Sequence, residues 1–357
     1  MSTTESPQLD QAKLEAFVGR FLGDLGTAMH LPTVLVGDRL GLYRAMASSR
    51  PVTPAELAER TGTSERYVTE WLAAQAAAGY VDYDRAAGSF RLPPEHAALL
   101  IDQGAPVFIP GAFQLAGSMV KDEPLITEAF RTGKGVAWHE HHPDLFVGCE
   151  RFFHPGYAAH LTSEWLPALD GVEDKLRTGA KVADVGCGHG ASTFIMATAF
   201  PDSTFVGFDY HDASIEARRS VESDGLGDRV RFDVASAQEY PGKGYDLVAF
   251  FDCLHDMGDP VGAARHVLSS LVPDGTWMIV EPYANDRLQD NLTPVGKIYY
   301  AASTLICTPA SKAQEIGLAL GAQAGERRMR DVATQAGFTR FRRAAETPVN
   351  IVYEARP

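Results

Sequence analysis

The feature that most constrains this fold is a run of three alternating glycines directly after a short apolar strand. Residues 181–185 form the predicted strand, Gly186, Gly188 and Gly190 follow it, and a helix is predicted over 191–199. Glycine gives the backbone positive φ angles and lets a ligand approach closely, and a helix N-terminus presents free N–H groups. This order predicts a loop that binds a nucleotide-like ligand. The alternative interpretation is a strand, turn and helix that hold no ligand.

The acidic residues near this loop favour one kind of ligand. Asp209 lies at the end of the next predicted strand, where a carboxylate can accept both hydroxyls of a ribose. Asp184 opens the loop, and its charge would repel a pyrophosphate but attract a sulfonium or an ammonium group. The loop also lacks the G-x-G-x-x-G spacing of dinucleotide sites. Adenosylmethionine therefore fits the loop better than NAD does.

The pattern from residue 180 onward predicts an α/β fold. Short apolar segments alternate with helical ones, which is typical of a mostly parallel sheet covered on both faces. The predicted strands are residues 181–185, 204–208, 229–232, 245–250, 275–280, 340–342 and 349–355.

Residues 180–285 resemble a class I S-adenosylmethionine-dependent methyltransferase, and the phrase from Asp184 to Gly190 matches the first motif of that family. The resemblance implies a Rossmann-like, doubly wound, seven-stranded sheet over residues 176–357. Ser236 stands where the family has an acid that receives the adenine. The implied cofactor-binding residues are Asp184, Gly186, Gly188, Gly190, Asp209, Tyr210, Ser236, Ala237, Phe251 and Asp252.

The segment Leu-His-Asp-Met at residues 254–257 carries the predicted chemistry. It resembles the Leu-His-Asp-Trp signature of small-molecule O-methyltransferases, with methionine in place of tryptophan. The resemblance implies that His255 is the general base for a hydroxyl acceptor and that two acids flank it, Glu281 and Glu326. The alternatives are a loop histidine that caps the next helix, and solvated carboxylates at the two acidic positions.

Two further segments are predicted to shape the acceptor pocket. In the family, the insertion at residues 282–320 forms part of that pocket, and its aromatic residues favour a flat or apolar acceptor. The cluster at residues 138–142 lacks the H-E-x-x-H spacing of a zinc site, so we expect a polar aromatic loop over the cavity and no metal. Residues 101–175 are predicted to be a helical linker and a substrate lid.

The N-terminal part, residues 1–100, has a mostly helical pattern. Two helices at 54–60 and 65–78, joined by a short turn, are followed by a predicted two-stranded wing, so the segment resembles a winged-helix domain. In the O-methyltransferases this domain mediates dimerisation, which implies a homodimer, and the apolar positions at residues 14–22 suit that role.

Charge argues against a nucleic-acid partner. Residues 52–92 hold four basic and six acidic side chains, and the whole chain has a net charge of −14, whereas a DNA reader needs clustered cations. A winged-helix transcriptional regulator that binds adenosylmethionine stays as the alternative function. The four scattered cysteines, the polar start and the lack of a long apolar stretch predict a cytoplasmic protein with no membrane span.

Overall fold

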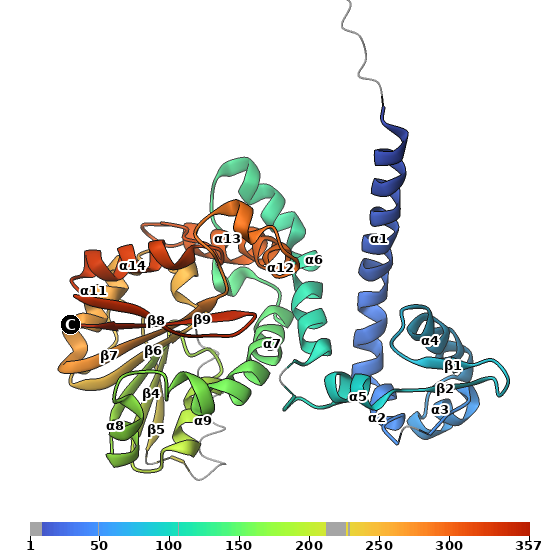
Figure 1. Ribbon diagram of the computed structural model, residues 1–357, viewed down its shortest axis with the longest axis horizontal. Coiled ribbons are helices and arrows are strands. Elements are labelled where there is room, and N and C mark those ends of the chain that lie inside the picture. Colours follow the sequence, from blue (N-terminus) through green and yellow to red (C-terminus); the bar gives the residue numbers. More distant parts are fainter. Residues whose placement is uncertain (1–8, 49, 106, 212–225, 228) are drawn as a thin grey trace, which may run out of the picture. The chain divides into compact units, whose positions relative to one another are not determined.

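The computed structural model describes residues 9–48, 50–105, 107–211, 226–227 and 229–357 (Figure 1). The chain divides into two compact units, one made of Met1–Gln103 and Phe108–Phe113, the other of Gly104–Val107 and Gln114–Pro357. Most of the predicted linker therefore belongs to the second unit. No helix within the described ranges has both the length and the apolar character needed to cross a membrane.

The first unit is a winged-helix domain, as the sequence predicts. Thr53 caps α3 and exchanges hydrogen bonds with Glu56, because the first turn of a helix leaves its N–H groups without partners. Gly62, with φ +63°, ends α3 and begins the turn into α4. The elements of this unit are α1 (Gln11–Arg39), α2 (Leu42–Ala45), α3 (Pro54–Thr61), α4 (Glu65–Ala77), the antiparallel pair β1 (Asp82–Asp84) and β2 (Ser89–Arg91), and α5 (Pro94–Ile101).

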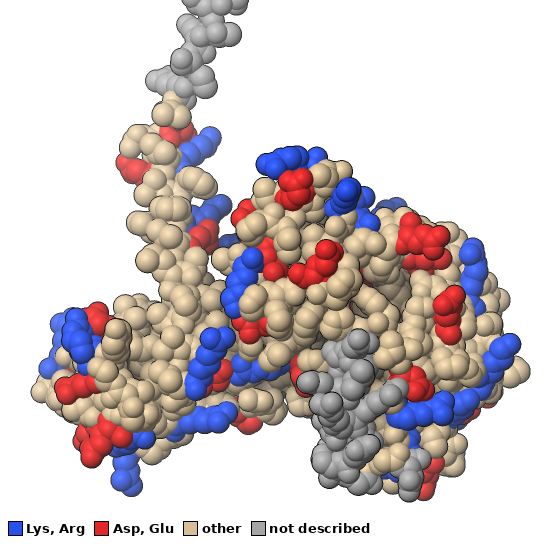
Figure 2. Space-filling view, turned by 180° about the vertical axis from the view of Figure 1, so that it is seen from behind, with Lys and Arg blue, Asp and Glu red and all other residues tan. Residues whose placement is uncertain are grey.

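Helix α1 leaves a large apolar surface uncovered in the single chain. Figure 2 shows that only scattered charged side chains interrupt its visible surface. Such a surface on a folded chain is typical of an interface. The exposed apolar side chains of α1 are Leu14, Phe17, Val18, Phe21, Leu22, Leu25, Met29 and Val36.

The second unit is built on a seven-stranded sheet with the order β5-β4-β3-β6-β7-β9-β8. Neighbouring strands from β5 to β7 are parallel, and β9 is antiparallel to both β7 and β8. Every predicted strand is present, and the largest differences are extra residues at the start of β7 and the end of β8. The strands are β3 (Lys181–Val185), β4 (Thr204–Asp209), β5 (Val230–Val234), β6 (Tyr245–Phe251), β7 (Leu271–Pro282), β8 (Arg340–Glu346) and β9 (Asn350–Arg356).

Helices cover both faces of this sheet (Figure 1). One apolar core lies under α11 (Pro260–Ser270) and α14 (Gly325–Ala336), and a second lies under α8 (Val172–Thr178) and α9 (Ala191–Ala199). Side chains of β3, β6 and β7 alternate between the two cores, which is why these strands read as continuous apolar runs.

Several of the remaining helices lie at the carboxyl edge of the parallel strands, where a doubly wound sheet binds its ligand, whereas the turn at Leu161–Trp165 packs into the second core. Two long helices precede β3, and a group of short ones follows β7. They are α6 (Ile109–Thr132), η1 (Trp138–Glu140), α7 (Asp144–His160), η2 (Leu161–Trp165), η3 (Leu254–Asp256), η4 (Leu288–Asn291), α12 (Pro294–Ala302), η5 (Ser303–Cys307) and α13 (Thr308–Lys312).

Candidate active site

The glycine loop between β3 and α9 has the backbone that its sequence predicts. Gly186, Gly188 and Gly190 all have positive φ angles, of 75°, 53° and 82°. A Cβ on Gly186 would lie 2.7 Å from Sγ of Cys253, and one on Gly190 would lie 2.6 Å from the ring of Phe232. Side chains at these two positions would therefore clash as well as strain the backbone.

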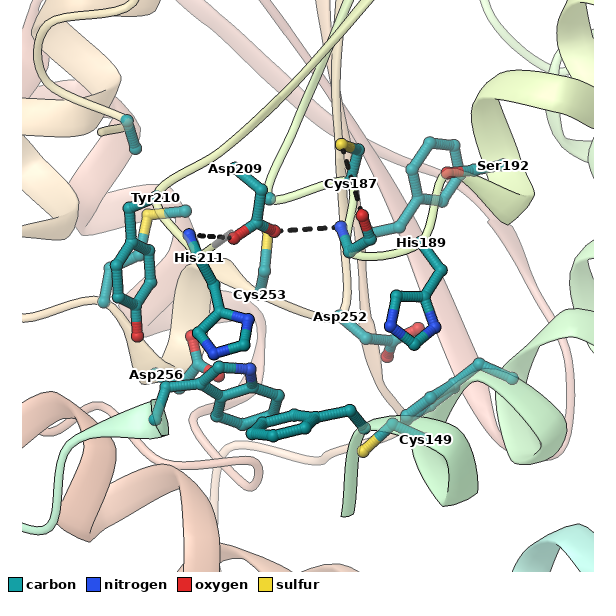
Figure 3. A pocket seen from close by; sticks show the side chains of 18 of the residues that line it. Cys149, Cys187, His189, Ser192, Asp209, Tyr210, His211, Asp252, Cys253 and Asp256 are labelled. Atoms are coloured by element: carbon teal, nitrogen blue, oxygen red, sulfur yellow. Dashed lines mark hydrogen bonds between the residues drawn. The ribbon is translucent and has the colours of Figure 1, made fainter. Parts of the chain in front are cut away.

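A cavity of about 390 Å³ opens above this loop. It is bordered by the loops after β3, β4, β5 and β6, and by one side of α7 (Figure 3). Its volume suits a small-molecule ligand. Of the predicted cofactor-binding residues, those that line it are Gly186, Gly188, Asp209, Tyr210, Ser236, Ala237, Phe251 and Asp252.

Asp209 ends β4 and is held by two backbone donors. One carboxylate oxygen accepts from the N–H of Gly188 at 2.9 Å, and the other accepts from the N–H of His211 at 2.9 Å. Burial nevertheless raises the pKa of Asp209. A carboxylate has further lone pairs, so Asp209 can still accept from hydroxyl groups in the cavity.

Asp184 does not line the cavity, which corrects the expectation that it faces a sulfonium or an ammonium group. Its side chain is 1% exposed, and one oxygen accepts from the hydroxyls of Ser192 and Thr193, both at 2.6 Å. Burial raises its pKa to about 6, although the two hydroxyls act in the opposite direction. Asp184 therefore anchors the first turn of α9 behind the loop.

Asp252 follows β6 and has an unusual backbone, with φ of +49°. Its carboxylate accepts from the hydroxyl of Tyr157 at 2.7 Å and from the side-chain amide of Asn350 at 2.9 Å. Burial and the nearby Glu281 raise its pKa to about 7. Non-glycine residues in this region cost energy and concentrate at functional sites.

His255 lies in η3 and is paired with Glu281 at the end of β7. Nδ1 of the imidazole is 2.6 Å from Oε2, while Oε1 accepts from the backbone N–H of Leu254 at 3.0 Å. Both side chains are buried. Burial alone would lower the pKa of His255, but the charge of Glu281 raises it well above the usual value. Asp259, not His255, caps the next helix.

The second predicted acid, Glu326, is not brought to the histidine. It lies in the first turn of α14, and its carboxylate accepts from Arg330 at 2.6 Å near the surface. The other side of the imidazole is instead occupied by Cys307, whose Sγ is 3.3 Å from Nε2. Neither Cys307 nor His255 borders the cavity, although Cys253, Asp256 and Met257 do. Cys307 lies in the insertion at residues 282–320, but no motif predicted its contact with His255.

Helix α7, which belongs to the segment predicted as linker and lid, supplies the largest set of cavity residues outside the predicted site residues. Glu150 binds Nδ1 of His189 at 2.8 Å, and the ring of Phe146 lies 4.9 Å from that of His211, so α7 contacts two of the sheet loops. The aromatic residues of this segment were the available signal. The cavity residues from α7 are Phe146, Cys149, Glu150, Phe153, His154 and Tyr157.

Residues of the cluster at 138–142 lie in two different environments. Trp138 lines the cavity, as expected of an aromatic loop there, whereas His141 is buried with Nδ1 2.9 Å from a carboxylate oxygen of Asp122. Within the described part of the chain, no group of His, Cys, Asp and Glu side chains could hold a metal ion.

Two family models match the chain. The model of the Rv2258c-like winged HTH domain covers residues 28–101, and that of a methyltransferase domain covers residues 176–334. The second unit therefore contains a methyltransferase domain, and the first contains a winged helix-turn-helix domain. The predicted methyltransferase class and the predicted folds of both parts are confirmed, and the DNA-binding regulator is not favoured.

Curated relatives match in part of their length. The 27-O-demethylrifamycin SV methyltransferase of Amycolatopsis mediterranei is 35% identical over 104 residues, which are 28% of this chain and 38% of that protein. Phosphoethanolamine N-methyltransferase 3 of Arabidopsis thaliana is 32% identical over 138 residues, which are 37% of this chain and 27% of that protein. The chain thus spans less than half of the length of these relatives.

Solved structures match over nearly the whole chain. A putative O-methyltransferase from Nostoc punctiforme has a TM-score of 0.71 at 18% identity and covers 95% of this chain and 98% of its own. Mitomycin 7-O-methyltransferase has a TM-score of 0.68 at 22% identity, and the match covers 98% of this chain and 100% of that one. Human N-acetylserotonin methyltransferase, solved with S-adenosylmethionine, has a TM-score of 0.69 at 16% identity, and the match covers 100% of this chain and 99% of that one. At these identities the likeness shows the fold.

Proposed function

We propose that the protein transfers a methyl group from S-adenosylmethionine to a hydroxyl of a small molecule, with His255 as the general base. The observation that carries this proposal is the buried pair of His255 and Glu281 beside a cofactor-sized cavity. A titratable imidazole oriented by a carboxylate is the arrangement that removes a proton from a hydroxyl.

The residues present fit the cofactor. Asp209 has free lone pairs for the ribose hydroxyls, and the residues after β5, including Ser236 and Ala237, border the part of the cavity that suits the adenine. The positive φ of Gly186 brings the backbone close to the cavity without a side chain. When bound, the sulfonium supplies the methyl group by direct displacement, so the protein mainly positions the two reactants.

His255 and Glu281 act on the acceptor's proton. Glu281 holds Nδ1 as the donor, which leaves Nε2 as the proton acceptor, and its charge stabilises the imidazolium that forms. The raised pKa of His255 means that the neutral imidazole becomes more abundant, and the reaction faster, as the pH rises. For an acceptor hydroxyl to reach Nε2, Sγ of Cys307, which lies 3.3 Å from that nitrogen, has to move aside.

The walls of the cavity suit a flat acceptor. Trp138 and Phe146 lie with ring centroids 5.8 Å apart on one side, and Met257 and Gln314 border the same cavity. Part of this wall, Gln314 and the neighbouring Ala310, comes from the predicted insertion at residues 282–320. The names of two similar proteins, the 27-O-demethylrifamycin SV methyltransferase and mitomycin 7-O-methyltransferase, support oxygen as the methyl acceptor, whereas the phosphoethanolamine N-methyltransferase is named for nitrogen.

A homodimer is part of the proposal. Helix α1 exposes apolar side chains, among them Phe17 and Phe21. In a homodimer, a second copy of the chain would bury these side chains. Charge-introducing variants such as Phe21→Glu would then shift the protein to the monomer in sedimentation. The cytoplasmic location stays a prediction.

The test uses labelled S-adenosylmethionine and a panel of phenols and other hydroxyl compounds. We expect transfer to at least one flat hydroxyl acceptor, and a loss of about 10²–10⁴-fold in kcat/KM for His255→Ala. Cofactor affinity, measured by calorimetry, should stay within about twofold, because His255 does not border the cavity. Full activity of His255→Ala on a hydroxyl compound that the wild type methylates would refute the role of His255 as general base. Transfer only to amines or carbon would refute O-methylation.

A further inference from the structure

The cavity has an unbalanced set of charges. Four carboxylates line it, those of Glu150, Asp209, Asp252 and Asp256, and no Lys or Arg from the described residues does. Glu150 is bound to His189. Asp209 accepts from two backbone N–H groups and is also the residue predicted to bind the ribose. Asp252 and Asp256 have no positively charged partner or ligand group assigned to them so far, although a buried charge needs a partner.

Asp252 is the better built of these two. Both of its hydrogen-bond donors, Tyr157 and Asn350, come from distant parts of the chain and are fixed in α7 and β9. These donors hold the carboxylate in place, but both are neutral, so they orient the charge without compensating it. The backbone of Asp252 adopts a φ of +49° to present the side chain there. Figure 3 shows the carboxylate within the cavity.

The groups around Asp252 do not neutralise it. Of the groups that shift the pKa of Asp252, one can carry a positive charge, the imidazole of His255, and it is bound to Glu281. Burial together with Glu281 raises the pKa of Asp252 to about 7, the direction expected of a carboxylate that lacks a cation. The titratable groups that act on it or respond to it are Cys149 and Tyr157 of α7, His255 of η3, Glu281 of β7 and Tyr299 of α12.

We propose that Asp252 is the residue by which the site distinguishes the positively charged cofactor from its neutral thioether product. The inference rests on the proposed function. In the transfer, the bond from sulfur to methyl breaks with its electron pair left on sulfur, a bond from the acceptor oxygen to methyl forms, and His255 takes the proton. Asp252 faces a cation before this step and an uncharged sulfur after it. Attraction is therefore lost only once the methyl group has gone, which favours product release.

The test compares the dissociation constants of S-adenosylmethionine and S-adenosylhomocysteine by calorimetry. Asp252→Asn keeps the size of the side chain and an acceptor for Tyr157 but removes the charge. We expect the variant to bind S-adenosylmethionine at least about tenfold more weakly and S-adenosylhomocysteine within about threefold of wild type. Asp256→Asn is the matched control, because it removes a carboxylate from the same cavity; it should change the ratio of the two constants by less than about threefold.

A second readout is the proton. Because a cation favours the ionised form of Asp252, wild type should release a fraction of a proton near pH 7 when it binds S-adenosylmethionine but not when it binds S-adenosylhomocysteine. Calorimetry in buffers of different ionisation enthalpy measures this release, and Asp252→Asn should abolish it.

Three outcomes would overturn the inference. They are an equal loss of affinity for both ligands in Asp252→Asn, an equal change of the ratio in Asp256→Asn, and a proton release that persists in Asp252→Asn. A wild type that binds both ligands and shows one of these results leaves the proposed function standing. A wild type that binds neither would overturn the proposed function together with this inference.

Discussion

Two loops at the same edge of the sheet are built in different ways. The loop of Gly186–Gly190, after β3, takes its shape from the positive φ angles of its glycines, and Asp209 at the end of β4 accepts from the N–H of Gly188. The loop of residues 252–257, after β6, is held by side chains far away in sequence, from Tyr157, Glu281 and Asn350. Cofactor binding is thus encoded locally, whereas the chemistry depends on tertiary structure.

The largest expected effect tests the second loop. Glu281→Gln keeps a hydrogen bond to Nδ1 of His255 but removes the charge that stabilises the imidazolium. We expect kcat/KM to fall by about 10²–10³-fold and cofactor affinity to change by less than about twofold. Because the two residues act as a unit, the double variant with His255→Ala should be no worse than His255→Ala alone. Additive losses would mean that Glu281 acts independently of the histidine. A melting curve of each variant controls for folding.

The first loop should respond in the opposite way. A valine at Gly190 would place its Cβ 2.6 Å from the ring of Phe232 and would be strained at φ +82°. We expect Gly190→Val to weaken cofactor binding by at least about thirtyfold, measured by calorimetry. Gly188→Ala is the matched control, since its Cβ meets no atom within 4 Å; its loss should be clearly smaller. Equal losses would show that strain alone, without the clash, sets the geometry.

The uncompensated charge in the second loop predicts a pH effect on stability without cofactor. The pKa of Asp252 is raised from 3.8 to about 7 by burial and Glu281. The stability that its proton contributes is present below pH 3.8 and is lost as the pH rises to about 7. Asp252→Asn should therefore melt a few degrees above wild type at pH 8, and the difference should shrink toward pH 5.

A surface carboxylate supplies the control for that melting experiment. Asp274 is exposed, and Lys175 lowers its pKa, so Asp274→Asn should give no such gain at pH 8. A gain in both variants would assign the effect to the net charge of the protein rather than to Asp252.

The smallest expected effect concerns Glu326. Its partner is Arg330, one turn away on α14, and exposed ion pairs of this kind contribute little. Glu326→Ala should therefore change kcat/KM by less than about twofold in the acceptor assay. A loss of tenfold or more would indicate that α14 moves toward His255 during the reaction.

The sequence predicts the parts of this molecule that depend on short segments. The seven strands, the capped helix at Thr53, the glycine loop and Asp209 are each specified by neighbouring residues or by their position after a strand. Glu281 was predicted from the family resemblance, which implies an acid at this place after the strand. The orientation of Asp184 could not be predicted, because it depends on two hydroxyls in the next helix.

Contacts between distant segments were the other limit. Cys307 meets His255 because residues 303–307 form a π-helical turn beside η3, and a spacing of 52 residues carries no such information. The lining from α7 likewise depends on how a long helix packs across the loops, which aromatic composition indicates only in general terms.

The position of β9 between β7 and β8 bears on how the protein is made. Among the described strands, β8 pairs with β9 alone, and β9 also supplies Asn350, which holds the carboxylate of Asp252. During synthesis, β3 to β7 can assemble while the later residues are still in the ribosome. The edge of β7 stays open until residues 350–356 emerge, and the active-site loop lacks its support until then. A ribosome that stalls shortly before this point would expose an unpaired strand edge, and such edges promote aggregation.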